Sequence, residues 1–383
     1  MNAVRPTCFD VAVVGAGPAG CSAALALARA GHAVLLLEKA VLPRYKTCGG
    51  GVLARAFKLL PPNAESVVER SFSSAALNFL GDNMDFVATR PEPMVYMTMR
   101  ADLDCLLARE AQKAGVQLVD SCRVQRVQTR EGDVEILSDR GNYRAKFVVA
   151  ADGVHSATAK AAGWLDLPAL APALEHEIYP AAGDFARFSE RPRFDFNTID
   201  AGYAWIFPKR KHLSVGILST HRVCPDLPAK LAGYLRRLGL ERVDKTERHG
   251  YLIPLAPRRE PLARGRVLLA GDAAGLVDPI TAEGISHAIL SGQLAAAALT
   301  EGRLDVAKVG AIYQSLLEKN ILGELRAARF LARMLYRHPR IRNGVFRLNG
   351  QALCEFVTQI IMGESGYREA LKRPASYLKF LGW

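Results

Sequence analysis

The stretch from Asp10 to Lys39 constrains the fold more than any other part of the chain. Its apolar run at 11–14 is typical of a strand buried on both faces, and it leads directly into GAGPAG at 15–20. A segment rich in alanine and leucine with high helix propensity follows, and a second apolar run covers 34–37. A glycine pattern alone is weak support, but here strand, glycines, helix, strand and acid occur in order. The stretch therefore predicts a βαβ unit that binds a dinucleotide.

Each glycine of this motif has a separate geometric task. Gly15 permits the tight turn, Gly17 lets the backbone approach a pyrophosphate, and Gly20 lets helix and strand pack closely. The helix amino terminus adds free N–H donors and a positive dipole end for the phosphates. Glu38, at the end of the second strand, is placed to accept hydrogen bonds from the adenosine ribose. The residues expected at the dinucleotide are therefore Gly15, Gly17, Pro18, Ala19, Gly20, Glu38 and Lys39.

Length and composition place this unit in a larger folded protein. With 383 residues the chain exceeds one simple core, so we expect two intertwined lobes and a terminal extension. No stretch approaches the ~20 apolar residues of a membrane-spanning helix, and the first ten residues lack the apolar core of a secretory signal. The 7 cysteines are scattered, without the spacing of metal ligands. We therefore expect a cytoplasmic protein without a metal site.

The net charge of +12 calls for a negatively charged partner. No motif of a nucleic-acid-binding module is present, so cofactor phosphates, a diphosphate-bearing substrate or an anionic membrane surface fit better. The basic tail beyond Leu304 places Arg326, Arg329 and Arg333 on one face of an expected continuous helix at 322–346. That helix would either lie in a membrane interface or pack on the dinucleotide-binding lobe with solvated arginines.

Three consecutive glycines, 49–51, follow the segment PRYKTC at 43–48. Glycine loses more conformational entropy on folding than any other residue, so the run needs a physical reason. A flat ring that lies against the backbone is one reason, and a flexible surface loop is the other. The helical pattern expected at 52–60 favours an ordered segment.

The remaining chain alternates between two kinds of segment. Short antiparallel strands are expected at 74–99, and a stretch rich in proline, aromatic residues and strands at 165–251. The other segments return to the dinucleotide-binding unit: a helix at 100–114, strands at 116–119 and 266–270, a meander at 127–149, and a helix at 283–300. The meander ends in Asp152-Gly153, and the strand at 266–270 ends in Gly271-Asp272.

These elements together resemble the FAD-binding core of the hydroxybenzoate-hydroxylase-like flavoproteins. The resemblance implies that Arg100 contacts the ribityl and pyrophosphate region, that Asp152 and Gly153 form the family's DG motif, and that Asp272 holds the ribityl hydroxyls. It also places the start of the helix at 283–300 near the flavin ring, with its positive end toward the ring. Further cofactor contacts expected on this basis are Val124, Gly284 and Ile285.

Two further stretches resemble the signatures of the geranylgeranyl reductase family, which hydrogenates polyprenyl chains with reduced FAD. They are PRYKTCGGGV at 43–52 and YAWIFPK at 203–209 followed by Val215-Gly216. In a strand Tyr203, Trp205 and Phe207 share one face, and this apolar wall would bind a polyprenyl chain beside the ring. The resemblance implies that Cys48, Gly49 and Gly50 lie at the cofactor, with Cys48, Gly49, Tyr203 and Trp205 in the catalytic site. Cys48 would be a packing thiol or a proton relay.

The sequence departs from the family pattern at Ala159, where the DG motif of the monooxygenases continues to an arginine linked to NADPH use. The electron donor is therefore left open between NAD(P)H, ferredoxin and a reduced flavin. Two other functions stay open as well: a flavin-dependent monooxygenase or halogenase on the same scaffold, and an FAD-bearing binding protein without turnover.

The expected fold is α/β, with a Rossmann-type FAD-binding domain interleaved with an antiparallel-sheet substrate domain and a helical C-terminal region. The predicted FAD-binding domain is discontinuous and comprises 8–73, 100–164 and 252–303. The predicted substrate-binding domain comprises 74–99 and 165–251, and the helical C-terminal region covers 304–383. The partner expected is a prenyl lipid or prenyl diphosphate, and the oligomeric state is left open.

Overall fold

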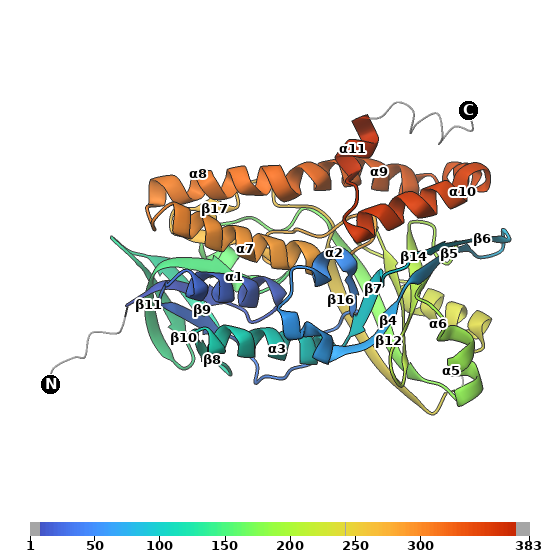
Figure 1. The fold of residues 1–383 in the computed structure, drawn as a ribbon, viewed down its shortest axis with the longest axis horizontal. Coiled ribbons are helices and arrows are strands. Elements are labelled where there is room, and N and C mark those ends of the chain that lie inside the picture. The colour runs from blue at the N-terminus through green and yellow to red at the C-terminus, as the bar shows by residue number, and fades with distance from the viewer. Residues whose placement is uncertain (1–7, 242, 373–383) are drawn as a thin grey trace.

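The computed structural model describes residues 8–241 and 243–372, whose strands form three sheets (Figure 1). The largest sheet has a parallel core in the order β18-β11-β1-β2-β8. Its strands are β1 (Cys8–Val14), β2 (Val34–Leu37), β8 (Gln117–Val119), β9 (Val124–Thr129), β10 (Val134–Ser138), β11 (Gly141–Ala150), β17 (Ala263–Arg264) and β18 (Val267–Leu269). Because β1 and β2 are almost wholly buried, their continuous apolar runs match a parallel sheet covered on both faces. The predicted Rossmann-type core is confirmed.

Two helices lie against this sheet, α1 (Pro18–Arg29) and α3 (Arg100–Lys113), and α7 (Ile285–Glu301) packs on α1 (Figure 1). The helix α1 contacts both of the others, and α7 approaches it so closely that a Cβ on Gly292 would lie 2.2 Å from the carbonyl oxygen of Ala19. The short helix α4 (Ala157–Ala161) and the 3₁₀ turn Gly271–Ala273 follow β11 and β18. The start of α1 and the ends of β11 and β18 thereby meet at one edge of the sheet.

The second sheet has seven strands in the order β16-β12-β15-β14-β13-β5-β6, with all neighbours antiparallel except β13 and β5. They are β5 (Ser74–Phe79), β6 (Met84–Thr89), β12 (Leu170–Tyr179), β13 (Arg193–Phe196), β14 (Gly202–Pro208), β15 (Leu213–Ser219) and β16 (Lys245–Pro254). The outer face packs against the apolar side of α6 (Leu227–Leu238), and α5 (Ala182–Phe188) lies beside it (Figure 1). The other face carries Tyr203, Trp205 and Phe207, as strand alternation predicts.

A third, small sheet joins β3 (Gly51–Leu53), β7 (Val95–Thr98) and β4 (Val68–Phe72). The helix predicted at 52–60 is therefore wrong in its first part, because Val52 pairs with Tyr96 and only α2 (Ala54–Phe57) is helical, before the 3₁₀ segment Pro62–Val67. Pairing with β7 overrides the local helical pattern. The strand β7 itself belongs to this sheet and not to the one that contains β5 and β6.

The chain ends in a layer of helices: α8 (Val306–Leu317), a π-helical turn (Glu318–Leu322), α9 (Gly323–Arg337), α10 (Pro339–Met362) and α11 (Tyr367–Lys372) (Figure 1). The single helix expected at 322–346 is wrong, since α9 ends before His338, as expected for a residue that precedes a proline. Residues 373–383 of the predicted C-terminal region lie outside the described residues. Among the described residues no helix combines the length and the apolar character that crossing a bilayer requires.

Candidate active site

One cavity of about 680 Å³ extends from the carboxyl ends of β1 and β2 to the aromatic face of the seven-stranded sheet. Almost all of the site residues expected from the sequence line it: Gly15, Gly17, Pro18, Ala19, Glu38, Lys39, Cys48, Gly49, Gly50, Arg100, Val124, Asp152, Gly153, Tyr203, Trp205, Phe207, Asp272, Gly284 and Ile285. The exception is Gly20, which packs beneath the wall. The sequence motifs, far apart in the chain, thus meet around a single space.

The glycine turn at the start of α1 has the geometry that its spacing predicts. Gly15 adopts φ +101°, and a Cβ there would lie 2.4 Å from the carbonyl oxygen of Ala151. A Cβ on Gly20 would lie 1.8 Å from the carbonyl oxygen of Gly15. Gly17, in contrast, faces open space up to the Arg100 guanidinium, whose Nη2 is 3.8 Å from the same ideal Cβ position. Two glycines are therefore required by packing, and the third leaves the backbone free for a phosphate.

Glu38 is buried at the end of β2 and holds the glycine turn. Its Oε2 accepts a 2.8 Å hydrogen bond from the Ala16 N–H, and its Oε1 accepts a 3.1 Å bond from the Ala40 N–H. The Arg44 Nε lies 3.2 Å from Oε1. The Arg44 Nη2 donates to Oε2 at 3.4 Å, so protein donors already surround both oxygens of this carboxylate, and a contact with ribose hydroxyls stays a prediction.

Two arginines form the cationic wall opposite the glycine turn, and both are held by Asp104. The Arg100 Nε and the Arg44 Nη1 each lie 2.9 Å from an oxygen of this fully buried carboxylate. Burial disfavours the charged guanidinium, but the neighbouring carboxylates outweigh it and raise the pKa of both arginines. Arg44 was missed as a site residue, although it lies in the quoted segment at 43–52.

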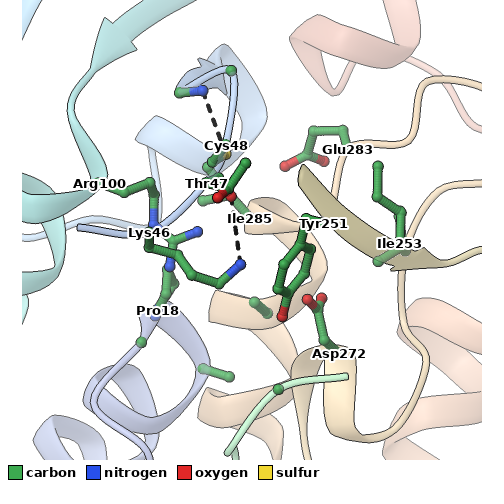
Figure 2. Close-up of a pocket in the computed structure, with 18 of the residues that line it drawn as sticks. Pro18, Lys46, Thr47, Cys48, Arg100, Tyr251, Ile253, Asp272, Glu283 and Ile285 are labelled. Carbon is green, nitrogen blue, oxygen red and sulfur yellow. Dashed lines mark hydrogen bonds between the residues drawn. The ribbon is translucent and has the colours of Figure 1, made fainter. Parts of the chain in front are cut away.

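Lys46 and Tyr251 extend side by side into the middle of the cavity, with Asp272 below them (Figure 2). The Lys46 Nζ lies 3.1 Å from the centre of the Tyr251 ring, and burial lowers the pKa of this lysine to about 8. Burial also raises the pKa of Asp272. Within the described part of the chain, no N–H or O–H donates to the Asp272 carboxylate. An acceptor left free in this way fits the ribityl hydroxyls of FAD.

The turn before α7 is held by three phenol hydroxyls from separate elements. Tyr203 donates to the carbonyl oxygen of Thr281 at 2.5 Å, and Tyr336 of α9 donates to that of Ile280 at 2.5 Å. Tyr367 of α11 donates to Asp278 Oδ2 at 2.8 Å. This clamp fixes a turn whose Ala282 has a positive φ of 54°, and it aims the start of α7 into the cavity.

The Glu283 side chain, which lines the same turn, is already engaged by protein groups. Its Oε1 accepts the Ser286 N–H at 2.6 Å, and its Oε2 lies 3.2 Å from the Arg55 Nη2. The backbone around Gly284 and Ile285 is therefore the part of the turn that is free to face a ring, as the sequence predicts.

At Gly49 the loop of the segment at 43–52 contacts the aromatic strand at 203–209. A Cβ on Gly49 would lie 2.8 Å from the Phe207 ring and 3.3 Å from the Trp205 Nε1. Beside it the Gly50 N–H donates to the Cys48 Sγ at 3.3 Å, and the Cys48 N–H donates to Glu175 Oε2 at 3.1 Å. The glycines at 49 and 50 thus let the loop lie flat between the dinucleotide end and the aromatic strand.

Beyond Gly49 the cavity wall is largely apolar. Small and apolar residues from the two smaller sheets, their connecting loops and α10 line it: Gly51, Leu53, Ala75, Val95, Pro192, Phe194, Leu218, Ile253, Val277 and Ile361. Tyr251, Glu175 and Ile361 have no sequence signal of their own, because each is a strand or helix residue whose position only the fold reveals. This end of the cavity suits an apolar chain.

Two family models match the chain. The one described as an FAD binding domain matches residues 8–171, and the one described as an FAD dependent oxidoreductase matches residues 100–298. Together they cover the glycine motif, Arg100, Asp152 and Asp272, which supports FAD as the cofactor.

Among solved structures, a geranylgeranyl bacteriochlorophyll reductase-like protein from Thermoplasma acidophilum has a TM-score of 0.76 at 22% identity, covering 97% of this chain and 95% of that one. A flavin-dependent brominase has a TM-score of 0.73 at 20% identity, covering 96% of this chain and 98% of the brominase. At these identities the likeness establishes the fold that the enzymes share.

The curated relatives are more specific. The digeranylgeranylglycerophospholipid reductase 2 of Methanothermobacter thermautotrophicus is 33% identical over 78% of this chain and 80% of its own length. The geranylgeranyl diphosphate reductase of Rhodobacter capsulatus is 30% identical over 76% of this chain and 74% of its own length. The chain therefore belongs to the geranylgeranyl reductase family of FAD-dependent oxidoreductases.

Proposed function

We propose that this enzyme saturates carbon–carbon double bonds of a polyprenyl chain bound in the apolar end of the cavity. The observation that carries the proposal is the junction at Gly49, where the dinucleotide end meets a largely apolar pocket walled by Trp205 and Phe207. The relatives are named as reductases of a digeranylgeranyl phospholipid and of geranylgeranyl diphosphate, and both substrates carry such chains.

Bound FAD supplies the hydride chemistry. In this chain Arg44, Arg100 and the start of α1 would hold its phosphates, and Asp272 its ribityl hydroxyls. Gly49 would let the ring lie against the loop, while Tyr203 and Trp205 orient the alkene. The apolar wall would exclude water from the reacting carbons, and Cys48 would lie beside them as a packing thiol or as a proton relay.

The polar head of the substrate would stay outside the pocket. Because no cationic side chain lines the apolar end in the described residues, a diphosphate or phospholipid head would be buried there without a partner, at a high cost. The enzyme would therefore accept prenyl chains with different heads. The electron donor stays open between NAD(P)H, ferredoxin and a reduced flavin, because the buried Ala159 offers no charge for a nicotinamide phosphate. Its reaction precedes the reduction of the prenyl chain and is tested separately.

Anaerobic incubation of the reduced enzyme with geranylgeranyl diphosphate or with a digeranylgeranyl phospholipid tests the reaction. The product should gain about 2 Da for each bond, because one hydride and one proton are added. Trp205→Ala should retain FAD and lose most turnover, because it removes apolar wall and no phosphate contact. Flavin bleaching by NADH, NADPH or reduced ferredoxin identifies the donor.

The second candidate, a monooxygenase or halogenase, is favoured by the likeness to the brominase fold. It predicts a product heavier by one oxygen or one halogen atom, formed only in air. Such a product, without any saturated product under anaerobic conditions, would contradict the reductase proposal.

Peripheral contact with an anionic membrane is part of this proposal, because a polyprenyl lipid partitions into bilayers. The outward faces of α9 and α10 expose Phe330, Met334, Ile341 and Leu348 at 53%, 54%, 61% and 72%. Between them lie the exposed arginines Arg326, Arg329, Arg333, Arg337, Arg340 and Arg347, and Glu324 is the one acid from 323 to 349. Exposed basic and apolar side chains on the same two helices suit contact with a membrane interface, and α10 also supplies Ile361 to the cavity wall.

Co-sedimentation with liposomes tests this contact. Binding should require anionic lipid, weaken at high salt, and fall when Arg329 and Arg333 are both changed to Glu. The matched control changes Arg236 and Arg237 to Glu, an exposed pair on α6, and should bind like the wild type. Equal amounts of protein in the supernatant with neutral and anionic liposomes would refute membrane contact.

A further inference from the structure

Glu175 lies on the cavity-facing side of β12, next to the edge strand β16 of the seven-stranded sheet. In the strand register it lies opposite Gly216, and Gly216 lies opposite Trp205, so the three residues form one row across β12, β15 and β14. Gly216 has no side chain, and the Trp205 indole fills the space above it: a Cβ there would lie 2.1 Å from the ring. The indole can therefore reach across β15 toward Glu175.

A short chain of hydrogen bonds completes this row. The Trp205 Nε1–H donates to Ser214 Oγ at 3.2 Å, and the Ser214 hydroxyl donates to Glu175 Oε1 at 2.5 Å. From the other side, the Cys48 N–H donates to Glu175 Oε2 at 3.1 Å. Indole and amide N–H groups are donors only, so the direction of the chain is fixed and both carboxylate oxygens accept. That is the hydrogen-bond pattern of an ionised carboxylate.

This carboxylate is only 2% exposed, yet no ion pair joins it to a lysine, arginine or histidine among the described residues. Charges of both signs lie around it. Lys209, Lys46 and Arg100 are near the loop that contains Cys48. Glu177 lies two residues further along β12. Burying a carboxylate without a salt bridge costs free energy of folding. An apolar residue at this position would give at least the same stability. Its place in the cavity wall therefore points to a role in the reaction.

We propose that Glu175 is a positioning residue with two tasks, holding the Cys48 backbone and the Trp205 indole in place and keeping a negative charge beside the flavin loop. This inference rests on the proposed function. In the reaction bound FAD would supply a hydride to one alkene carbon and be left oxidised, and the other carbon would gain a proton drawn from bulk solvent through a relay such as Cys48. A negative charge nearby disfavours the anionic reduced cofactor, and so makes it a stronger hydride donor, against the opposing pull of Lys209 and Arg100.

The test measures the midpoint potential of the bound FAD in the holoenzyme, without any prenyl substrate. Glu175→Gln keeps the size of the side chain and an acceptor for Cys48 but removes the charge, so its potential should become more positive. Ser214→Ala leaves the charge and cuts the link to Trp205, so the potential should stay while KM for the prenyl substrate rises. Glu177→Gln, a buried acid on the same strand that contacts Tyr45, is the matched control for the potential.

A potential of E175Q at the wild-type value overturns the electrostatic task, and an unchanged KM of S214A overturns the positioning task. If E175Q does not retain FAD, Glu175→Asp decides instead, because it keeps the charge and shortens the reach. It should hold the wild-type potential with a raised KM. A shifted potential would overturn the electrostatic task, and a wild-type KM would overturn the positioning task. Since the potential is measured without substrate, a failure of the proposed reaction would leave that result interpretable.

Discussion

Gly216→Ala is the substitution whose effect follows most directly from the structure. The added methyl group would lie 2.1, 2.4 and 2.5 Å from three atoms of the Trp205 indole. Ordinary contact begins at 3.4 Å, so the ring has to move by at least about 1.3 Å, and the strand below it cannot give way. The indole would be displaced toward the cavity that Trp205 lines.

The expected change in stability combines two costs and one gain. Overpacking a buried site costs about 1–3 kcal/mol, and the 3.2 Å hydrogen bond from Trp205 to Ser214 adds about 1 kcal/mol if it is lost. The lower chain entropy of Ala returns about 0.5–1 kcal/mol. We therefore expect the free energy of unfolding to fall by about 1–3 kcal/mol, with FAD retained and prenyl reduction largely lost.

Denaturant unfolding, the flavin spectrum and anaerobic turnover check this prediction on the same preparation. Gly233→Ala in α6 is the matched control, because a Cβ there meets nothing within 4 Å. It should raise stability by up to about 1 kcal/mol through helix propensity and leave turnover unchanged. Wild-type turnover and stability of the Gly216→Ala variant would refute the placement of the indole over β15.

Two further perturbations test the dinucleotide end. Gly20→Ala should prevent FAD retention, since its Cβ would lie 1.8 Å from the carbonyl oxygen of Gly15, and a yellow purified variant would contradict this. The pKa of Lys46 is lowered from 10.5 in the unfolded chain to about 8 in the folded protein. Between pH 8 and 10.5 the folded state therefore binds fewer protons than the unfolded state. The free energy of unfolding of FAD-free protein should rise with pH across this range. Lys46→Met should lack this part of the rise, and identical pH profiles of both proteins would argue against a buried Lys46.

The sequence was most informative where backbone geometry demands particular residues. Gly15 and Gly20 are required by contacts shorter than any side chain allows, so the motif predicted the βαβ unit and its cavity correctly. The helix expected at 52–60 failed because β3 gains hydrogen bonds from β7, a partner more than 40 residues away that local periodicity does not register.

The missed site residues share a different cause. Tyr251 and Glu175 lie on strands whose register decides which side chains face the cavity, and that register is set by pairing across the whole sheet. Arg44 and Lys46 were within a quoted motif, but their sequence neighbours do not show that Asp104 and Tyr251 would meet them. Long-range pairing, not composition, supplied these parts of the site.

The three phenols that hold the turn at 278–284 give the helical C-terminal layer a part in cofactor binding. Two of them, Tyr336 and Tyr367, come from α9 and α11. The folded conformation of these helices therefore stabilises the turn, and the ordered turn stabilises the helices. Linkage is reciprocal: whatever favours the ordered turn, FAD included, must tighten the distant helices by the same free energy. Amide exchange in α9 and α11 should therefore slow when the flavin is loaded. The stability of α9, which carries part of the surface proposed to contact the membrane, would then depend on whether FAD is bound.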